Sequence, residues 1–310
     1  MIKAYLIHLG QNLWKEPIGD PGPLSNYSFN MITEDDAWKK ITDFVKECGF
    51  NTLIIDLAEG YRYETHPELS VIGAWDKIKM KNELQRLRDM GLNPVPKLNF
   101  AATHDAWLKD YSHMLSTPTY YKVAKDLIDE VCELFDSPDY FHLGMDEECF
   151  EFSFYQQKYG FTCVRQGQVF WDDIRFLCKT VEENGVTPWL WGTKYWYEKE
   201  ETLLNMPKNA IISSGFYDRL LNPEHFILFQ APAYESTFKF SEHGFKQVPV
   251  CATYNTSINP DDFMATYKDL DGILGFMAAP WYRTREIDVL KHFAEAKVFK
   301  IAFEKYSITD

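Results

Sequence analysis

The chain has 310 residues, of which 45% are hydrophobic and 25% charged, a balance typical of a globular protein rather than a disordered or collagen-like one. Its net charge of -14 repels nucleic-acid phosphates, and no window holds the roughly 18 uninterrupted apolar residues of a membrane helix. We therefore expect neither a nucleic-acid partner nor a membrane partner.

Short apolar runs alternate with helical patterns along the whole chain. The runs are nearly continuous, as is typical of strands that are buried on both faces. The helical patterns repeat apolar residues every three or four positions and end at turn residues. In chain order we predict strand 4–9, a helix from Thr33 to Gly49, strands 52–57 and 93–98, a helix from Pro118, strand 140–145, a helix closed by Asn184-Gly185, strands 187–191, 210–214 and 248–253, a short helix from Asn259, strand 273–278, and a last helix lined by Ile287, Leu290, Ala294 and Ile301.

Eight strands with helices between them indicate an α/β fold, a single (β/α)8 TIM barrel that spans residues 1–310. In this fold the active site lies at the carboxyl ends of the strands. The functional residues are therefore expected in the segments that follow the strands, namely 8–14, 56–64, 98–107, 145–148, 191–196, 215–219, 254–257 and 280–285.

The six cysteines form no Cys-x-x-Cys pair, which predicts reduced thiols rather than zinc ligands or disulfides. The N-terminus enters strand-like sequence without the apolar core of a signal peptide. Both features predict a cytoplasmic protein, or a periplasmic or secreted one if a leader peptide has been removed. The sequence leaves the oligomeric state open, with a homodimer among the options.

Three consecutive carboxylates, Asp146, Glu147 and Glu148, follow the fourth predicted strand. Two close carboxylates push each other's pKa values apart, so that one can hold a proton near neutral pH while the other stays ionised. The alternative is a solvated acidic loop. We expect Glu148 to lie on a solvated face, and likewise expect Asp173, further along the chain, to lie on the surface.

Two further clusters follow the third and fifth predicted strands. His104, which precedes an aspartate, is suited to orient a catalytic carboxylate or to contact substrate; the alternative is a histidine held by a local hydrogen bond. Trp189 and Trp191 alternate, which puts both indoles on one face and suits a sugar-binding wall. The alternative is that the residues facing the barrel interior are simply large.

The segment His142-Leu143-Gly144-Met145-Asp146-Glu147 resembles the signature His-x-Gly-Gly-Asp-Glu of family 20 glycoside hydrolases, the β-N-acetylhexosaminidases, except at Met145. Residues 56–70 resemble the family's segment Asp-x-x-Gly-aromatic-Arg-x-Glu followed by Pro-Glu-Leu-Ser/Thr, and residues 102–104 stand where the family has Pro-Gly-His. Aromatic residues fall at the strand ends where the family keeps its acetamide-pocket and sugar-stacking rings, namely Trp191, Tyr254 and Trp281. The similarity covers most of the chain in the family's order.

The resemblance implies a retaining, substrate-assisted cleavage of a glycan or oligosaccharide that carries a 2-acetamido sugar, with no metal or organic cofactor. Glu147 would protonate the glycosidic oxygen and later deprotonate water. Asp146 would orient the acetamido group, whose carbonyl oxygen attacks the anomeric carbon. Tyr254 would donate a hydrogen bond to that oxygen, and Trp191 would enclose the methyl group. The other implied substrate-binding residues are His104, His142 and Trp281.

The sequence departs from the family at its sugar clamps. Gln11 stands where the family has an arginine, and Arg283 stands where the family has the glutamate of Trp-x-Glu. We therefore expect both residues to bind substrate on a rebuilt side of the subsite, with Arg283 able to pair with an anionic group on the glycan. The family's small N-terminal domain is also expected to be absent, because the first predicted strand begins within ten residues.

Two other functions are open at this stage. A metal-dependent sugar amidohydrolase or deacetylase on the same barrel would use ligands drawn from His8, His104, His142 and Asp146, although the first strand lacks a His-x-His pair. A non-catalytic glycan-binding barrel would account for the altered clamps. Retention of both Asp146 and Glu147 argues against it.

Overall fold

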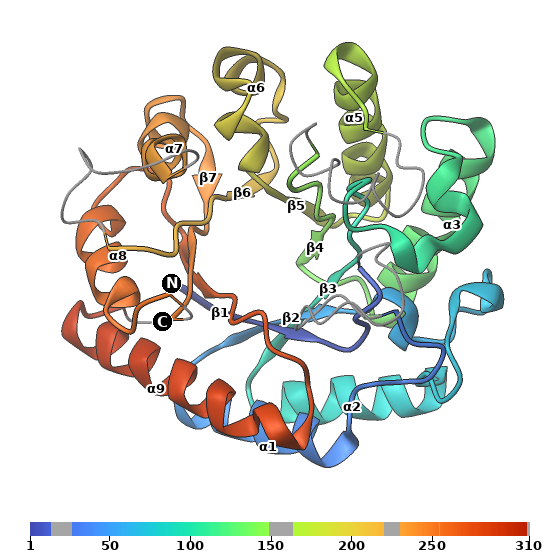
Figure 1. Ribbon diagram of the computed structural model, residues 1–310, viewed down its shortest axis with the longest axis horizontal. Helices are drawn as coiled ribbons and strands as arrows, with labels where there is room; N and C mark the ends of the chain where they lie inside the picture. Colours follow the sequence, from blue (N-terminus) through green and yellow to red (C-terminus); the bar gives the residue numbers. More distant parts are fainter. Residues whose placement is uncertain (14–26, 149–163, 220–229, 254, 309–310) are drawn as a thin grey trace.

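The computed structural model describes residues 1–13, 27–148, 164–219, 230–253 and 255–308. Its strands run parallel around a central axis, with the helices outside them (Figure 1). The sheet order is β7-β6-β5-β4-β3-β2-β1-β9-β8. The strands are β1 Ile2–His8, β2 Thr52–Asp56, β3 Asn93–Lys97, β4 Tyr140–His142, β5 Thr187–Trp191, β6 Ile211–Ser213, β7 Lys246–Gln247, β8 Val250–Cys251 and β9 Gly275–Ala278.

The seventh predicted strand is present but divided into β7 and β8 by Pro249, which has no N–H to donate. Segment 246–251 nevertheless bonds to both neighbours. On one side Val248 N donates to Ile212 O at 3.0 Å, and on the other Met277 N donates to Pro249 O at 2.9 Å. These bonds close the ring, which confirms the predicted (β/α)8 barrel.

Helices connect the strands along the outside of the barrel. Two of their starts are capped: the Asp76 side chain accepts from Lys79 N, and the Thr117 side chain accepts from Tyr120 N ahead of Pro118. The α-helices are α1 Asp35–Glu47, α2 Lys77–Asp89, α3 Pro118–Leu134, α5 Gly167–Glu183, α6 Lys199–Asn205, α7 Gln230–Glu242, α8 Asn259–Tyr267 and α9 Val289–Lys305; short 3-10 helices include η1 Ala58–Gly60, η3 Ala106–His113 and η4 Thr193–Trp196. Among the described helices, none has the length and apolar character needed to cross a membrane.

The last helix turns a different face to the barrel from the one predicted. The residues predicted to line it are exposed instead, namely Ile287, Leu290, Ala294 and Ile301. Its buried face includes His292, whose Nδ1 is hydrogen-bonded to the Tyr5 hydroxyl at 2.8 Å, and Glu295, which accepts from Thr253 N at 3.0 Å. Because these polar residues have partners inside the protein, an assignment based on apolar residues alone chose the wrong face.

The barrel interior changes from apolar to polar towards the carboxyl ends of the strands. Side chains alternate along each strand, so His8 and Asp56 lie one step beyond the apolar Leu6 and Ile54 on the same face. The Lys97 ammonium, which is fully buried, donates to Asp56 Oδ2. Burial alone would raise the pKa of Asp56, but Lys97 and His8 outweigh it and lower that pKa to about 2. A buried ion pair therefore lies at this end of the interior.

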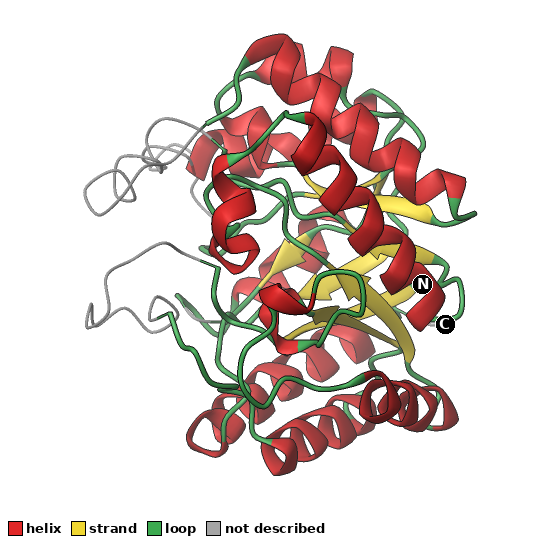
Figure 2. Ribbon diagram, turned by 90° about the vertical axis from the view of Figure 1, so that its right-hand side faces the viewer, coloured by secondary structure: helices red, strands yellow, loops and turns green. Residues whose placement is uncertain are grey.

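The end of the barrel that carries the candidate site is rich in loops. In Figure 2 the loops gather on the left, whereas β1 begins near the N-terminus on the right. Because the strands are parallel, the left side is the one at which they end. This is the side on which (β/α)8 enzymes build their sites.

Candidate active site

The carboxylates lie in a turn of unusual backbone that directly follows β4. Gly144, Met145 and Glu147 have φ angles of 71°, 69° and 48°, in the left-handed region that side chains other than glycine disfavour. The strand accordingly ends at His142, earlier than predicted. A Cβ at Gly144 would lie 2.0 Å from Asn99 Oδ1, so this position requires glycine. We call residues 144–148 the carboxylate turn.

The carboxylate turn and His104 come together. His104 Nδ1 lies 3.5 Å from Asp146 Oδ1, and His104 Nε2 lies 3.5 Å from Glu147 Oε2. One imidazole thus contacts both carboxylates, which are adjacent in sequence. Asp146 is buried, whereas the Glu147 side chain keeps 29% of its surface exposed and can reach a substrate.

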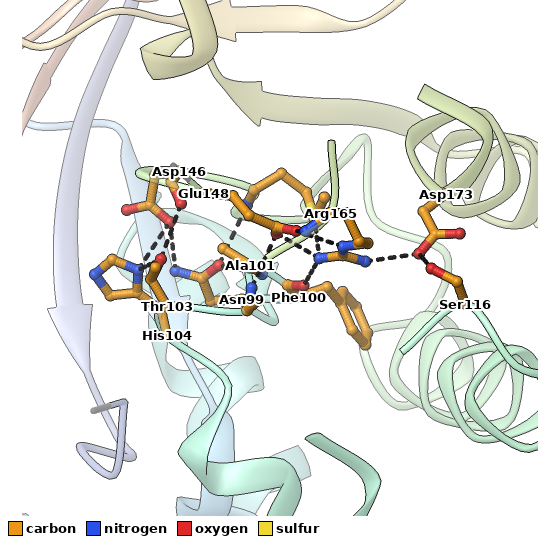
Figure 3. Close-up of polar contacts among 12 residues, drawn as sticks. Asn99, Phe100, Ala101, Thr103, His104, Ser116, Asp146, Glu148, Arg165 and Asp173 are labelled. Atoms are coloured by element: carbon orange, nitrogen blue, oxygen red, sulfur yellow. Dashed lines mark hydrogen bonds and ion pairs between the residues drawn. The ribbon is translucent and has the colours of Figure 1, made fainter. Parts of the chain in front are cut away.

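The loop after β3 holds Asp146 in place (Figure 3). Asn99 Nδ2 donates to Asp146 Oδ1 at 2.8 Å, and Thr103 Oγ1 donates to the Asp146 carbonyl at 3.2 Å. The other side of the Asn99 amide accepts from Met145 N at 3.2 Å. On the opposite flank, Glu147 N donates to Thr193 Oγ1 at 3.0 Å. These bonds fix the backbone on both sides of the two carboxylates.

The electrostatics of the turn favour a protonated Glu147. Burial, followed by the charge of Asp146, raises the pKa of Glu147 to about 8. Burial also lowers the pKa of His104, despite the attraction of Asp146. Near neutral pH the site therefore combines a protonated Glu147 and an uncharged imidazole, beside Asp146, which accepts a hydrogen bond from Asn99. Such a set can donate a proton and orient a polar group.

Aromatic rings from several strand ends lie around the mouth of the barrel. The Trp191 ring lies 6.0 Å from that of Trp281 and 4.8 Å from that of His142. Trp189 is anchored deeper, because its Nε1 donates to Ser213 Oγ at 2.7 Å. Trp191 Nε1 is buried and has no hydrogen-bond partner among the described residues. Trp191 and Trp281 therefore form a wall with a donor still available.

His142, predicted to bind substrate, is fully buried under the turn. Its Nδ1 accepts from Gly144 N at 3.1 Å, and its ring stacks on Trp189 with centroids 5.6 Å apart. Burial, with Lys97 adding to it, lowers the pKa of His142 well below its usual range. In this arrangement His142 supports the carboxylate turn from below.

The two predicted clamp residues lie on loops after β1 and β9. Gln11 is 4% exposed, and neither atom of its side-chain amide has a hydrogen-bond partner among the described residues. Its backbone N donates to Glu59 Oε1 at 2.7 Å, so Glu59 fixes the loop. Arg283 is partly exposed, and its Nε also lacks a partner within the described chain. Tyr254 lies outside the described residues.

Two acidic residues expected on the surface are buried instead, which corrects the sequence interpretation. Glu148 and Asp173 side chains are both 0% exposed, and Arg165 bridges them. Charged residues are almost never fully buried unless they are paired, and Arg165 supplies the pairing. Arg165 belongs to no recognisable motif, and the only available signal was Asp173 at a position on the buried stripe of α5.

The described residues contain no group of three or more His, Cys, Asp or Glu arranged to hold a metal ion. The ligand set considered from the sequence, drawn from His8, His104, His142 and Asp146, is therefore not assembled. His8 instead lies 3.3 Å from Asp56 Oδ2, beside the buried lysine.

No protein-family model and no curated protein matches the sequence. Solved structures do match. A β-N-acetylhexosaminidase from Bacteroides fragilis has a TM-score of 0.61 at 16% identity, over 95% of this chain and 66% of that one. Dispersin B has a TM-score of 0.61 at 14% identity, over 97% of this chain and 99% of that one. A family 20 exo-β-N-acetylglucosaminidase from Vibrio harveyi has a TM-score of 0.61 at 12% identity, over 99% of this chain and 57% of that one.

The chain has the fold of family 20 glycoside hydrolases. The predicted resemblance is thereby confirmed at the level of the fold. The chain spans 66% of the Bacteroides structure and 57% of the Vibrio structure, and almost the whole of Dispersin B.

Proposed function

We propose that the protein is a glycoside hydrolase that cleaves β-linked 2-acetamido-2-deoxyhexosides, of the N-acetylglucosamine or N-acetylgalactosamine type. The proposal rests on the contact of both carboxylates with one imidazole: Asp146 lies 3.5 Å from Nδ1 of His104, and Glu147 lies 3.5 Å from its Nε2. This geometry brings two carboxyl groups together, and the proposal assigns them different tasks. The fold shared with known hexosaminidases supports the same function.

In the first step, Glu147 donates its proton to the glycosidic oxygen. Asp146, held by Asn99, accepts a hydrogen bond from the N–H of the substrate's acetamido group. This bond orients the acetamido carbonyl oxygen, which attacks the anomeric carbon as the leaving group departs. The ring formed carries a positive charge, and the Asp146 carboxylate stabilises it.

In the second step, the deprotonated Glu147 takes a proton from water, which attacks the anomeric carbon from the face that the leaving group vacated. The acetamido group is restored, and two inversions give overall retention. Because the substrate supplies the nucleophile, the mechanism requires no nucleophilic side chain from the protein.

The remaining residues of the predicted site bind the sugar in this proposal. Trp191 and Trp281 enclose the acetamido methyl group and one face of the ring. Tyr254 donates to the acetamido oxygen. Gln11 and Arg283 contact the substituents on the far side of the ring, where polar atoms that have no partner among the described residues favour a substituted or differently configured sugar.

A substrate panel tests the proposal. p-Nitrophenyl glycosides of 2-acetamido sugars and acetamido-containing oligosaccharides are compared with matched 2-hydroxy sugars, using Glu147→Gln and Asp146→Asn as controls. We expect hydrolysis only when the acetamido group is present. Equal rates for the 2-hydroxy sugars would disprove the substrate-assisted mechanism.

A thiazoline mimic of the cyclised intermediate separates the enzyme from a glycan-binding barrel. We expect it to inhibit turnover competitively. Tight binding without turnover of any member of the panel would instead support a non-catalytic protein.

A further inference from the structure

We propose that Arg165 is a positioning residue that holds the carboxylate turn in its left-handed conformation and so sets the placement of Asp146 and Glu147. This inference rests on the proposed hydrolase function. Arg165 lies two residues before α5, far in sequence from the turn, and its side chain is 2% exposed.

The guanidinium contacts the residues immediately before and after the carboxylate pair. On the far side of the pair, Arg165 Nε donates to Glu148 Oε1 and Nη2 donates to Glu148 Oε2, both at 2.6 Å. On the near side, Nη2 lies 3.7 Å from Met145 Sδ. The Arg165 guanidinium therefore contacts both ends of the Met145–Glu148 tetrapeptide. Such bidentate pairing fixes orientation as well as distance.

The other end of Arg165 is anchored in the helical layer (Figure 3). Its Nη1 donates to Asp173 Oδ2 on α5 at 2.8 Å. The same carboxylate accepts from Ser116 Oγ at 2.8 Å and from the Tyr121 hydroxyl of α3. The turn is thus tied through Arg165 to two helices outside the barrel, rather than only to neighbouring loops.

Arg165 also joins the turn to the loop that carries Asn99 and His104. Its Nη2 donates to the Phe100 carbonyl at 2.6 Å, and Ala102 N donates to Glu148 Oε2 at 2.9 Å. The two loops that meet at the imidazole of His104 therefore share one buried cation.

The turn needs such a support because its backbone is strained. Met145 and Glu147 both have positive φ angles, and residues of this kind persist only where the surroundings over-determine them. The family signature has glycine at the position of Met145, where the left-handed conformation carries no such penalty. Here the Met145 side chain is buried beside Arg165, so the contact that compensates for the strain comes from the same residue that holds Glu148.

A purely structural ion pair is the competing explanation, and the two differ in what a substitution changes. Loss of a structural pair lowers stability and leaves the chemistry of the folded molecules unchanged. Loss of a positioning residue shifts the two carboxylates, and a displacement of about 1 Å at reacting groups costs roughly a hundredfold in rate.

The test compares Arg165→Lys with Arg86→Lys on a p-nitrophenyl 2-acetamido glycoside. Arg86 is a matched control, because it also bridges two carboxylates, Glu83 and Asp43, beside a methionine sulfur, but on α2 outside the site. We expect Arg165→Lys to lower kcat about a hundredfold with a much smaller change in KM. The high-pH limb of the variant's pH–activity profile should also move to lower pH. The reason is that Glu147 moves away from Asp146, whose charge helps raise the pKa of Glu147. Arg86→Lys should keep both the kcat and the pH profile of the wild type.

An Arg165→Lys enzyme with the kcat and pH profile of the wild type would overturn the inference. If this variant does not fold, the triple variant Arg165→Met, Glu148→Leu and Asp173→Asn removes all three buried charges together, and proteins commonly tolerate the replacement of a buried ion pair or triad by uncharged side chains of similar size. We expect it to fold with a similarly lowered kcat, and a wild-type kcat would again overturn the inference. A wild-type protein inactive on the whole panel would instead refute the proposed function.

Discussion

The carboxylate turn differs from two side chains on the loops after β1 and β9, Gln11 and Arg283, in whether their polar groups have partners within the described residues. In the turn, protein groups from Asn99, Thr103, Thr193 and Arg165 bond the residues around the carboxylates. In the other loops, the Gln11 amide and Arg283 Nε have no partner among the described residues. Buried polar groups without partners are costly, and a ligand that supplies partners recovers this free energy.

We infer from this difference that the carboxylate turn serves the reaction, whereas Gln11 and Arg283 serve recognition of the sugar. The turn is already arranged before substrate arrives, as a site that acts on developing charge needs to be. Under the proposed function, a ligand would supply the partners that Gln11 and Arg283 lack among the described residues. Substitutions in the turn should therefore change kcat, whereas substitutions at Gln11 or Arg283 should change which sugar binds.

The largest effect is expected for Glu147→Gln, which removes the acid and base but keeps the shape of the side chain. We expect kcat to fall by about 10²–10⁴-fold on a p-nitrophenyl 2-acetamido glycoside, with the fold retained. Rescue of Glu147→Ala by azide on an activated substrate would confirm the assignment. A kcat within tenfold of the wild-type value would show that Glu147 is not the acid and base of the reaction.

Gly144→Ala tests the arrangement of the turn. The new methyl group would meet Asn99 Oδ1 at 2.0 Å, in addition to a left-handed penalty of about 1–2 kcal/mol. We expect a loss of stability larger than that penalty, and kcat lowered about a hundredfold in the molecules that fold. Denaturant unfolding and kinetics measure both.

Gly185→Ala is the matched control, because Gly185 has a similar φ of 75° and an added methyl group there would meet nothing within 4 Å. It should cost only the left-handed penalty, about 1–2 kcal/mol, with kcat unchanged. Equal effects of the two substitutions would show that the contact with Asn99 is unimportant.

The pH dependence of kcat/KM tests the coupling of the two carboxylates. Glu147 is active as an acid when protonated, so activity should fall as pH rises through about 8. Asp146→Asn removes the charge that helps raise this pKa. The high-pH limb should therefore move to lower pH, alongside a loss of rate from the altered acetamide contact. An unmoved limb would mean that Asp146 does not influence Glu147.

The same pKa shift predicts a stability change of known sign. Because the folded pKa of Glu147 is raised from 4.5 to about 8, the native state holds a proton that the unfolded chain has lost, and stability falls as pH rises between these values. Glu147→Gln escapes this loss. Its melting temperature should therefore exceed that of the wild type at pH 9 by more than it does at pH 5.

The smallest effect on the basic reaction is expected for Arg283→Gln. Its stability should stay within about 0.5 kcal/mol of the wild type, because the side chain is partly exposed. With a neutral 2-acetamido glycoside, kcat should be unchanged. With a sulfated one, KM should rise about tenfold, since a charge-assisted bond of roughly 1.4 kcal/mol is lost. Equal KM values for the two substrates in the wild type would exclude an anionic specificity.

Most of the barrel could be predicted because its strands are buried on both faces and read as continuous apolar runs. The errors arose where polar residues have partners inside the protein. His292 and Glu295 are buried on α9 with hydrogen bonds, so an apolar pattern misplaced that helix's inner face. Helix α2 was not predicted because few of its residues are apolar, although Met80, Leu84 and Leu87 are buried.

The candidate site was predictable only where residues are adjacent or follow a motif. Asp146, Glu147 and His104 lie at ends of strands, and the fold brings them together. Asn99 and Thr193 contribute single polar groups from different loops, and no local pattern marks them. Arg165 pairs with Glu148, which lies well before it in the sequence, and separation along the chain does not predict which side chains meet in the fold.

The cluster of indoles at the barrel mouth gives the protein a built-in optical probe. The chain has 9 tryptophans, and Trp191 and Trp281 lie with their rings 6.0 Å apart where the proposed sugar would sit. A sugar placed against them would change the surroundings of both rings, of which Trp281 is partly exposed and Trp191 is buried. Intrinsic fluorescence should then report ligand occupancy directly, even in inactive variants and for natural glycans that carry no chromophore.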